Sequence, residues 1–251
     1  MSESKKTKII AWLKKGLESL KKAFYPEGYV CYVCGAELDE EHREHSLCPK
    51  CLQRLPFRRN ENICPICGAY VTHFGPCPMC KDKLLPYKRA YAPFDYVGSI
   101  RNMIIAYKDE GSPWLHKYIS KFLIDYAKGM ELTADYLVYV PSSQKAIKRR
   151  GFEHNKDVAL AVSEALGIEL IEPLHRISQN KDSKSLSIDD RYKNVAAAFK
   201  MKEDYDRTPL IGKSILILDD VMSSGATVTT CAQILKNNGA KEINILTLAR
   251  S

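Results

Sequence analysis

The chain has 251 residues and a formal net charge of +8, from 38 Lys and Arg against 30 Asp and Glu. This length fits one large domain or a domain with a small module, and the positive charge favours polyanionic partners such as nucleic acid, acidic lipid or pyrophosphate-bearing metabolites. No apolar run is long enough for a membrane span, and charged residues interrupt the N-terminal sequence before the apolar core of a signal peptide develops. We therefore expect a soluble cytoplasmic protein with no transmembrane segment.

Residues 1–27 are predicted to form a basic amphipathic helix. Apolar side chains recur there at helical spacing, and lysines occupy the rest of the helix surface. Such a helix either binds a membrane surface or a partner, or docks by its apolar stripe on the rest of its own chain. Gly16 weakens a free-standing helix, which favours the docked interpretation.

Residues 28–83 are predicted to form a double zinc-ribbon module. Reduced CxxC pairs in a cytoplasmic protein bind metal more often than they form disulfides, and Zn²⁺ prefers four tetrahedral ligands. Two closed four-thiolate sites leave no open position for a substrate, so we expect two structural zinc ions. Pairing consecutive CxxC motifs is the simpler arrangement, and the spacing is also compatible with a crossed one. The eight ligands are Cys31, Cys34, Cys48, Cys51, Cys64, Cys67, Cys77 and Cys80.

Residues 84–251 are predicted to form an α/β domain in which Cys231 is a core residue. Residues 87–91 and 94–97 are expected to pair as a hairpin, followed by helices over 102–108 and 114–127. A strand over 136–140, a helix over 157–166 and a final strand over 243–248 follow. The polar segment 176–190 is typical of a mobile loop, and its place before the next strand suits a lid over a ligand.

A cationic segment follows the strand that ends near residue 140. It contains Lys145, Lys148, Arg149 and Arg150, directly before Gly151. Ligands of open α/β sheets bind at the carboxyl ends of the strands, so these side chains belong at that edge and are candidates for binding pyrophosphate. An ordinary basic loop or a nucleic-acid patch would give the same composition.

The most informative stretch is residues 214–230. Its apolar run, residues 215–218, predicts a buried parallel strand that ends at Asp219 and Asp220. A loop of small residues and a helix over 228–238 follow, an arrangement whose free N–H groups and helix dipole hold an anion. Carboxylates accept hydrogen bonds from a diol and bind Mg²⁺. The candidate phosphate-binding residues are Ser223, Ser224, Gly225, Ala226 and Thr227.

This stretch resembles the phosphoribosyl-pyrophosphate (PRPP) motif of type I phosphoribosyltransferases. The resemblance implies that the loop binds the 5'-phosphate and that Asp219 and Asp220 are catalytic residues at the ribose diol, with Mg²⁺. Two other interpretations compete with it: the acids merely cap a strand, or they belong to a receiver domain. A receiver motif opens its domain, whereas this one lies about thirty residues before the last residue given.

The chain from about Phe24 to Arg250 is similar to the ComF (ComFC) family. The resemblance implies a type I phosphoribosyltransferase-like fold, a mostly parallel sheet flanked by helices, joined to a zinc-ribbon module. It also implies a cytoplasmic role in the uptake of single-stranded DNA, with competence-machinery proteins as partners. Lys108, one of the matching residues, joins the pyrophosphate candidates. The other matches are the CxxC pairs, Gly111, residues 150–152, Leu186, Ser187, Arg191, Asn194, Phe199, the PRPP motif and residues 247–250.

The chain departs from the family pattern at two places. Glu153 and His154 stand where the family has Asn and Gln, and Ser183 stands where a Gln is usual. Both changes remove side-chain amides near the expected pyrophosphate. We expect PRPP binding and phosphoribosyl transfer, a glycosyltransferase reaction, to an acceptor that the sequence does not specify. The alternative is a non-catalytic nucleic-acid-binding protein that responds to PRPP or a nucleotide.

Overall fold

The computed structural model describes residues 29–59, 61–110, 112–177 and 197–251. The chain divides into two compact units, Met1–Arg54 and Leu55–Ser251. The predicted N-terminal helix and most of the predicted lid, from residue 178 on, lie outside the described residues. Within the described part of the chain, every helix is too short or too polar to cross a bilayer.

The described part of the smaller unit consists of two short helices and the loops around them. The 3-10 helix η1 (Glu40–His45) is capped by Asp39, whose side chain accepts a hydrogen bond from the His42 N–H at 3.0 Å. The helix α2 (Pro49–Gln53) begins with a proline, whose missing N–H costs nothing in the first helical turn. An isolated antiparallel bridge between Val30 and Glu37 closes the first CxxC turn.

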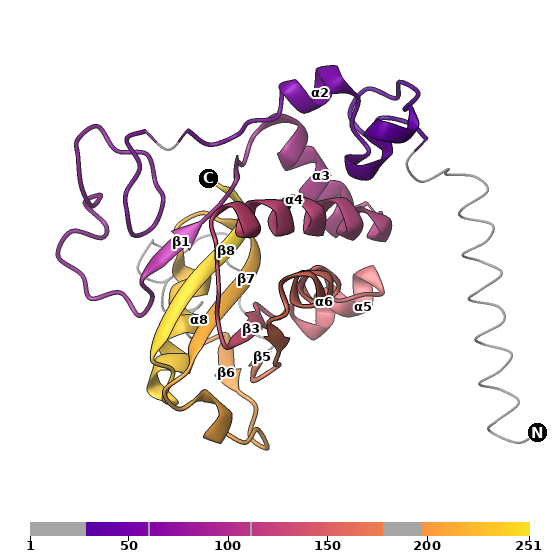
Figure 1. Ribbon diagram of the computed structural model, residues 1–251. Helices are drawn as coiled ribbons and strands as arrows, with labels where there is room; N and C mark the ends of the chain where they lie inside the picture. The colour runs from indigo at the N-terminus through magenta and orange to yellow at the C-terminus, as the bar shows by residue number, and fades with distance from the viewer. Residues whose placement is uncertain (1–28, 60, 111, 178–196) are drawn as a thin grey trace, which may run out of the picture. The chain divides into compact units, whose positions relative to one another are not determined.

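The larger unit is built on a six-stranded sheet with the strand order β1-β8-β7-β3-β4, and β2 also pairs with β8 (Figure 1). All of the pairings are parallel. Parallel sheets are covered on both faces, which explains the unbroken apolar run that opens β7. The strands are β1 (Arg89–Tyr91), β2 (Phe94–Asp95), β3 (Tyr136–Tyr139), β4 (Glu169–Leu170), β7 (Ser214–Met222) and β8 (Glu242–Arg250).

Helices cover both faces of this sheet. Ile215 and Ile217 of β7 share a core with Cys231 of α8, whereas Leu218 faces Ile104 of α3 and residues of α4 and α6 on the opposite side. This alternation follows from the two-residue period of a strand. The helices are α3 (Gly98–Asp109), η2 (Pro113–Leu115), α4 (His116–Gly129), α5 (Gln144–Arg150), α6 (His154–Leu166), η4 (Thr208–Leu210) and α8 (Ala226–Asn237). A separate antiparallel pair consists of β5 (Leu174–Arg176) and β6 (Phe199–Met201).

The second pair of CxxC motifs belongs to this larger unit. Cys64, Cys67, Cys77 and Cys80 are all buried, and they lie in the same hydrophobic cluster as the α8 side of the sheet. The Ala90 N–H of β1 donates to the Ile66 carbonyl at 2.7 Å, which joins this ribbon to the sheet. The division of the chain into two compact units thus falls between its two ribbons, at Arg54. The double-ribbon module over residues 28–83 stays a prediction.

The fold class is confirmed, and three local predictions differ from the structure. The strands β1 and β2 do not form a hairpin; each pairs with β8, because nine-residue β8 offers partners on both sides of the interruption at Pro93. The cationic segment is helical, with Ser143 as its N-cap. The strand β7 does not end at the two acids but continues to Met222, paired with β8 at Arg250.

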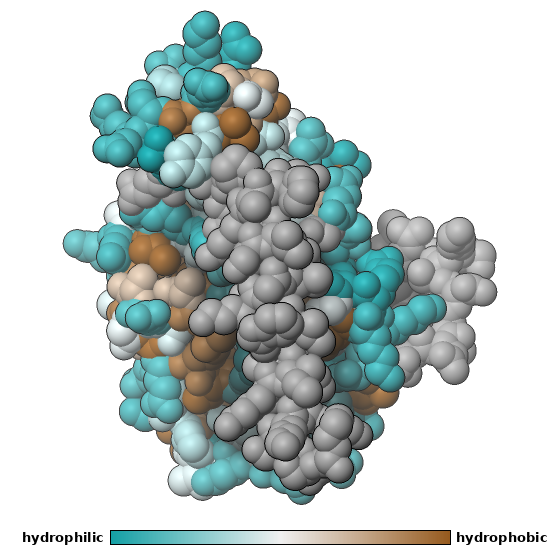
Figure 2. All heavy atoms as spheres, turned by 90° about the vertical axis from the view of Figure 1, so that its right-hand side faces the viewer, coloured by the Kyte–Doolittle hydropathy of each residue, from teal (hydrophilic) through white to brown (hydrophobic). Residues whose placement is uncertain are grey.

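The surface shown in Figure 2 is mainly hydrophilic, with small apolar areas between the polar side chains. Large apolar side chains are nevertheless exposed elsewhere in the described residues, and several belong to the ribbons. Phe74 and Leu84 are fully exposed, and Tyr29 and Tyr70 are about half exposed. Cys231 is completely buried, which confirms its predicted place in the core.

Candidate functional site

The carboxyl ends of β3 and β7 and the start of α8 surround one open cavity. Its position follows the general rule that ligands of α/β proteins bind where parallel strands end. The lining combines acids, cations and hydroxyl groups, which suits a phosphorylated, hydroxylated ligand. The lining residues include Tyr96, Lys108, Ser142, Ser143, Ala146, Arg150, His154, Asn155, Arg176, Asp219, Asp220, Ser223 and Thr227.

Asp219 is buried and lies in the C-terminal half of β7. Its Oδ1 accepts hydrogen bonds from Asn155 Nδ2 at 2.9 Å and from the Asp220 N–H at 3.0 Å. Burial, together with the neighbouring charge of Asp220, raises the pKa of Asp219 to about 6. Asn155 also donates to the Val140 carbonyl at 2.8 Å, so this amide joins the ends of β3 and β7.

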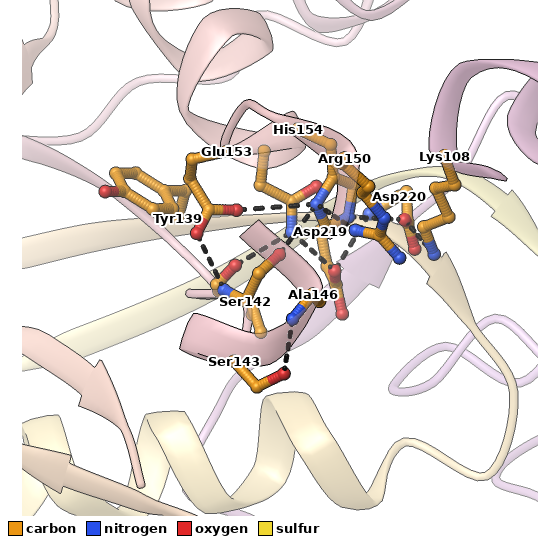
Figure 3. Close-up of polar contacts among 12 residues, drawn as sticks. Lys108, Tyr139, Ser142, Ser143, Ala146, Arg150, Glu153, His154, Asp219 and Asp220 are labelled. Carbon is orange, nitrogen blue, oxygen red and sulfur yellow. Dashed lines mark hydrogen bonds and ion pairs between the residues drawn. The ribbon is translucent and has the colours of Figure 1, made fainter. Parts of the chain in front are cut away.

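Asp220 has the opposite electrostatic character. Its Oδ2 forms an ion pair with Lys108 Nζ and accepts a hydrogen bond from His154 Nε2 at 2.8 Å (Figure 3). Burial by itself would raise the pKa of Asp220, but the charges of Lys108 and His154 outweigh it and hold that pKa well below its ordinary value. Two adjacent carboxyl groups thus have pKa values pushed apart, the environment in which one acid stays ionised while its neighbour is close to protonation.

His154 lies between the acid pair and the end of β3. Its Nδ1 is 2.8 Å from Ser142 Oγ, 3.2 Å from Arg150 Nη1 and 3.4 Å from Glu153 Oε1 (Figure 3). Burial lowers the pKa of this imidazole, but its hydrogen bonds to Asp220 and Glu153 outweigh burial, so the pKa is raised. The Tyr107 hydroxyl donates to the His154 carbonyl at 2.6 Å, which fixes the start of α6.

The predicted phosphate loop forms the second side of the cavity. Ser223 and Thr227 line it, and Gly225 is the N-cap of α8 with a φ of 79°. This positive φ favours glycine, and a β-carbon here would lie 2.7 Å from Met222 Cε, so the end of that flexible side chain would have to move. Ser224 Oγ accepts from the Ala226 N–H at 3.3 Å.

The structure brings two of the five cationic candidates to the cavity, Lys108 and Arg150. Lys145, Lys148 and Arg149 are exposed and do not line it, and Arg149 pairs with Asp109 at 2.7 Å. The helical form of this segment is the reason, because residues four apart share a helix face and only Ala146 and Arg150 face the cavity. Backbone and hydroxyl groups of Ser142 and Ser143 occupy the wall that we had expected lysines to form.

Sequence reasoning missed His154 and Asn155. They are 66 and 64 residues away from the acids that they contact, so no local pattern connects them. The sequence feature that could have revealed them is the departure from the family pattern at Glu153 and His154. We interpreted that departure only as a loss of side-chain amides. The structure shows instead that Asn155 still supplies an amide to Asp219 and that His154 adds a titratable donor to Asp220.

The eight predicted zinc ligands form two clusters, Cys31 with Cys34, Cys48 and Cys51, and Cys64 with Cys67, Cys77 and Cys80. The arrangement is therefore consecutive and not crossed. Sulfur atoms on one tetrahedral Zn²⁺ at about 2.3 Å lie about 3.8 Å apart. The Sγ atoms of Cys34 and Cys48 are 3.7 Å apart, and those of Cys67 and Cys77 are 3.6 Å apart, so both clusters fit structural zinc.

The comparisons with known proteins agree with both parts of the chain. Residues 20–89 match the double zinc ribbon domain, and residues 145–251 match the phosphoribosyl transferase domain. Competence protein ComFC of Streptococcus pneumoniae is 27% identical over 234 residues, covering 88% of this chain and 99% of that protein. Competence protein F of Haemophilus influenzae is 20% identical over 215 residues, covering 83% and 92%. The chain is thus similar to competence proteins over most of its length.

Another relative, the DNA utilization protein YhgH of Escherichia coli K12, is 27% identical over 230 residues, covering 88% of this chain and 97% of that protein. The similarity thus extends over nearly the whole of each relative. The acid pair and the loop at residues 223–227 lie inside the part of the chain that matches the phosphoribosyl transferase domain.

Proposed function

We propose that this cavity binds PRPP or a related ribose 5-phosphate ester and that the protein transfers the phosphoribosyl group to an acceptor. The observation that carries the proposal is the meeting of the acid pair, the loop at the start of α8 and two cations in one cavity. In this arrangement residues 223–227 hold the 5'-phosphate and Asp219 and Asp220 hold the ribose diol. Lys108 and Arg150 face the pyrophosphate.

The charges suit the chemistry of such a transfer. As the bond between C1' and pyrophosphate breaks, positive charge develops on the ribose and negative charge on the leaving group. Acids beside the sugar and cations beside the pyrophosphate then stabilise the transition state more than the substrate. Mg²⁺ is proposed to enter with PRPP, since this ion keeps several waters and binds through one or two carboxylates and substrate phosphates.

Titration calorimetry with PRPP and Mg²⁺ tests the assignment of the acids. Asp220→Asn removes the carboxylate charge but keeps the shape of the side chain, and it is expected to weaken PRPP binding at least tenfold, about 1.4 kcal/mol. Asp204→Asn, at an exposed acid away from the cavity, is the matched control and should bind like the wild type. Equal PRPP affinity in Asp220→Asn and the wild type would overturn the proposal.

The acceptor calls for a separate measurement. Pyrophosphate release from PRPP is followed in the presence of a panel of nucleobases and amines, and release with one of them identifies the reaction. We also propose a cytoplasmic role in the use or uptake of DNA, in which the ribose phosphate chemistry serves the processing of single-stranded DNA. The relatives' names, DNA utilization protein and competence protein, support a link to DNA and to competence.

A second candidate function is non-catalytic binding of single-stranded nucleic acid, under control of PRPP or a nucleotide. It is favoured by aromatic side chains on the ribbons: Phe74 is fully exposed, and the Arg43 guanidinium lies 4.4 Å from the ring centroid of Tyr29. Exposed rings stack on bases, and arginine adds charge. Salt-dependent binding of single-stranded DNA without pyrophosphate release would favour this function, and absence of DNA binding at low salt would count against it.

A further inference from the structure

The side chain of Arg250 joins the second zinc ribbon to the loop that precedes α8. Arg250 ends β8 and is only 9% exposed. Its Nε donates to the Cys67 carbonyl at 3.2 Å, and its Nη1 donates to the Met222 carbonyl at 3.0 Å and to the Ser223 carbonyl. One rigid guanidinium therefore connects a cysteine of the second cluster with the two residues that open the candidate phosphate loop.

These carbonyl groups determine the path of the loop. Met222 is the last residue of β7, and Ser223 already lines the cavity. The two carbonyls accept hydrogen bonds from Arg250, so the backbone that enters the loop is held at these two residues. A β-carbon on Gly225 would lie 2.7 Å from Met222 Cε, so the side chain of the last residue of β7 lies beside the N-cap of α8.

Tyr87 also lies between the second ribbon and the loop. Tyr87 is buried in the cluster that contains the four cysteines of the second ribbon. Its hydroxyl is 4.0 Å from the position that a β-carbon on Gly225 would take.

We infer that Arg250 is a positioning residue through which the second zinc site, and not the first, holds the phosphate-binding loop in its ligand-binding conformation. The first ribbon belongs to the other compact unit, so loss of its zinc leaves this connection in place. The inference deepens the proposed function and rests on it for the identity of the ligand. The coupling between ribbon and loop does not depend on that identity.

The coupling is tested without ligand by hydrogen exchange of the amides in residues 223–227. Cys80→Ser removes one ligand of the second zinc, and Cys51→Ser, the last ligand of the first, is the matched control. Zinc content is measured for each variant. We expect faster exchange in the loop for Cys80→Ser and for Arg250→Gln, and unchanged exchange for Cys51→Ser. Unchanged loop exchange in a folded Cys80→Ser protein that has lost one zinc would overturn the inference.

Binding of two probes shows whether the effect is local. Ribose 5-phosphate affinity is expected to fall about tenfold in Arg250→Gln, since one hydrogen bond to a charged group is worth about that factor. Pyrophosphate affinity should stay unchanged, because its proposed cations lie elsewhere in the cavity. Arg250→Lys keeps the positive charge but loses the planar set of N–H donors, so its ribose 5-phosphate affinity should lie between those of Arg250→Gln and the wild type. Such partial recovery would show that the loss in Arg250→Gln does not come from misfolding alone. Equal losses for both probes would contradict a positioning role.

The two proposals fail in different ways. A wild-type protein that binds neither PRPP nor ribose 5-phosphate contradicts the proposed function, while altered loop exchange in Cys80→Ser still supports the coupling. A wild-type protein that binds ribose 5-phosphate with an affinity unaffected by Arg250→Gln supports the function and contradicts the coupling.

Discussion

Replacing Asp219 with asparagine should make the fold more stable at neutral pH. Burial raises the pKa of the Asp219 carboxyl group from its ordinary value of 3.8 to about 6, so the folded protein binds the carboxyl proton more tightly than the unfolded chain does. The stabilisation of the fold by protonated Asp219 is fully present below pH 3.8 and is lost as the pH rises through about 6. At 1.36 kcal/mol for each pH unit between those values, the ionised side chain costs about 3 kcal/mol above pH 6.

Asparagine removes this cost and keeps the hydrogen bonds. In Asp219→Asn the side-chain Oδ1 still accepts from Asn155 and from the Asp220 N–H, and the side chain has nearly the same volume. Urea denaturation of the wild type and Asp219→Asn at pH 4, 6 and 8 measures the difference. We expect almost none at pH 4, and a gain approaching about 3 kcal/mol at pH 8.

The neighbouring acid provides the contrast. The folded pKa of Asp220 is lowered by Lys108 and His154 in spite of burial, so its contribution is present above the unfolded pKa and is lost only as the pH falls through the folded value. Asp220→Asn should therefore lower stability at pH 8. A stability gain in Asp219→Asn that does not change between pH 4 and pH 8, or equal signs for the two variants, would refute this reasoning.

Two further variants test other parts of the site. His154→Gln keeps a hydrogen-bond donor for Asp220 but removes the titratable imidazole. Because the pKa of His154 is raised in the folded protein, the imidazole stabilises the fold fully below its ordinary pKa of 6.5, and this stabilisation is lost as the pH rises through the folded pKa. The variant should be less stable than the wild type by about 1 to 2 kcal/mol at pH 6, and the deficit should shrink by pH 9; a constant deficit would contradict it. Gly225→Ala should cost about 1 to 2 kcal/mol and abolish ribose 5-phosphate binding, because its φ of 79° is strained for alanine and its β-carbon meets Met222. Gly167→Ala, with a φ of 67° and no atom within 4 Å of its β-carbon, should cost stability alone, and similar binding losses in the two glycine variants would speak against the contact.

The acid pair and the small-residue loop were predictable because their chemistry is concentrated in one continuous stretch. Asp219 and Asp220 directly follow the apolar run of β7, and the loop that comes after the strand leads into α8, so local spacing places them near one sheet edge. The zinc ligands were predictable for the same reason. Their consecutive arrangement required the structure, because the spacing of the CxxC pairs is compatible with both pairings.

The partners of the acids were not predictable from local spacing. Lys108, His154 and Asn155 come from α3 and α6, and only the packing of these helices beside the end of β7 brings them to the acids. The cationic segment shows the converse. Its composition indicates cations at the ligand, but in α5 Lys145 and Lys148 lie on other faces of the helix than Arg150 and are exposed away from the cavity.

The division of the chain at Arg54 places the two ribbons in different compact units, although their sequences look like repeats of one motif. Deleting the first ribbon removes one metal site and none of the residues in the cluster that surrounds Ile215 and Ile217. Deleting the second removes four buried cysteines from that cluster and exposes the sheet side that they cover. The first ribbon therefore contributes no side chain to this cluster, whereas the second is part of the core that packs on the sheet.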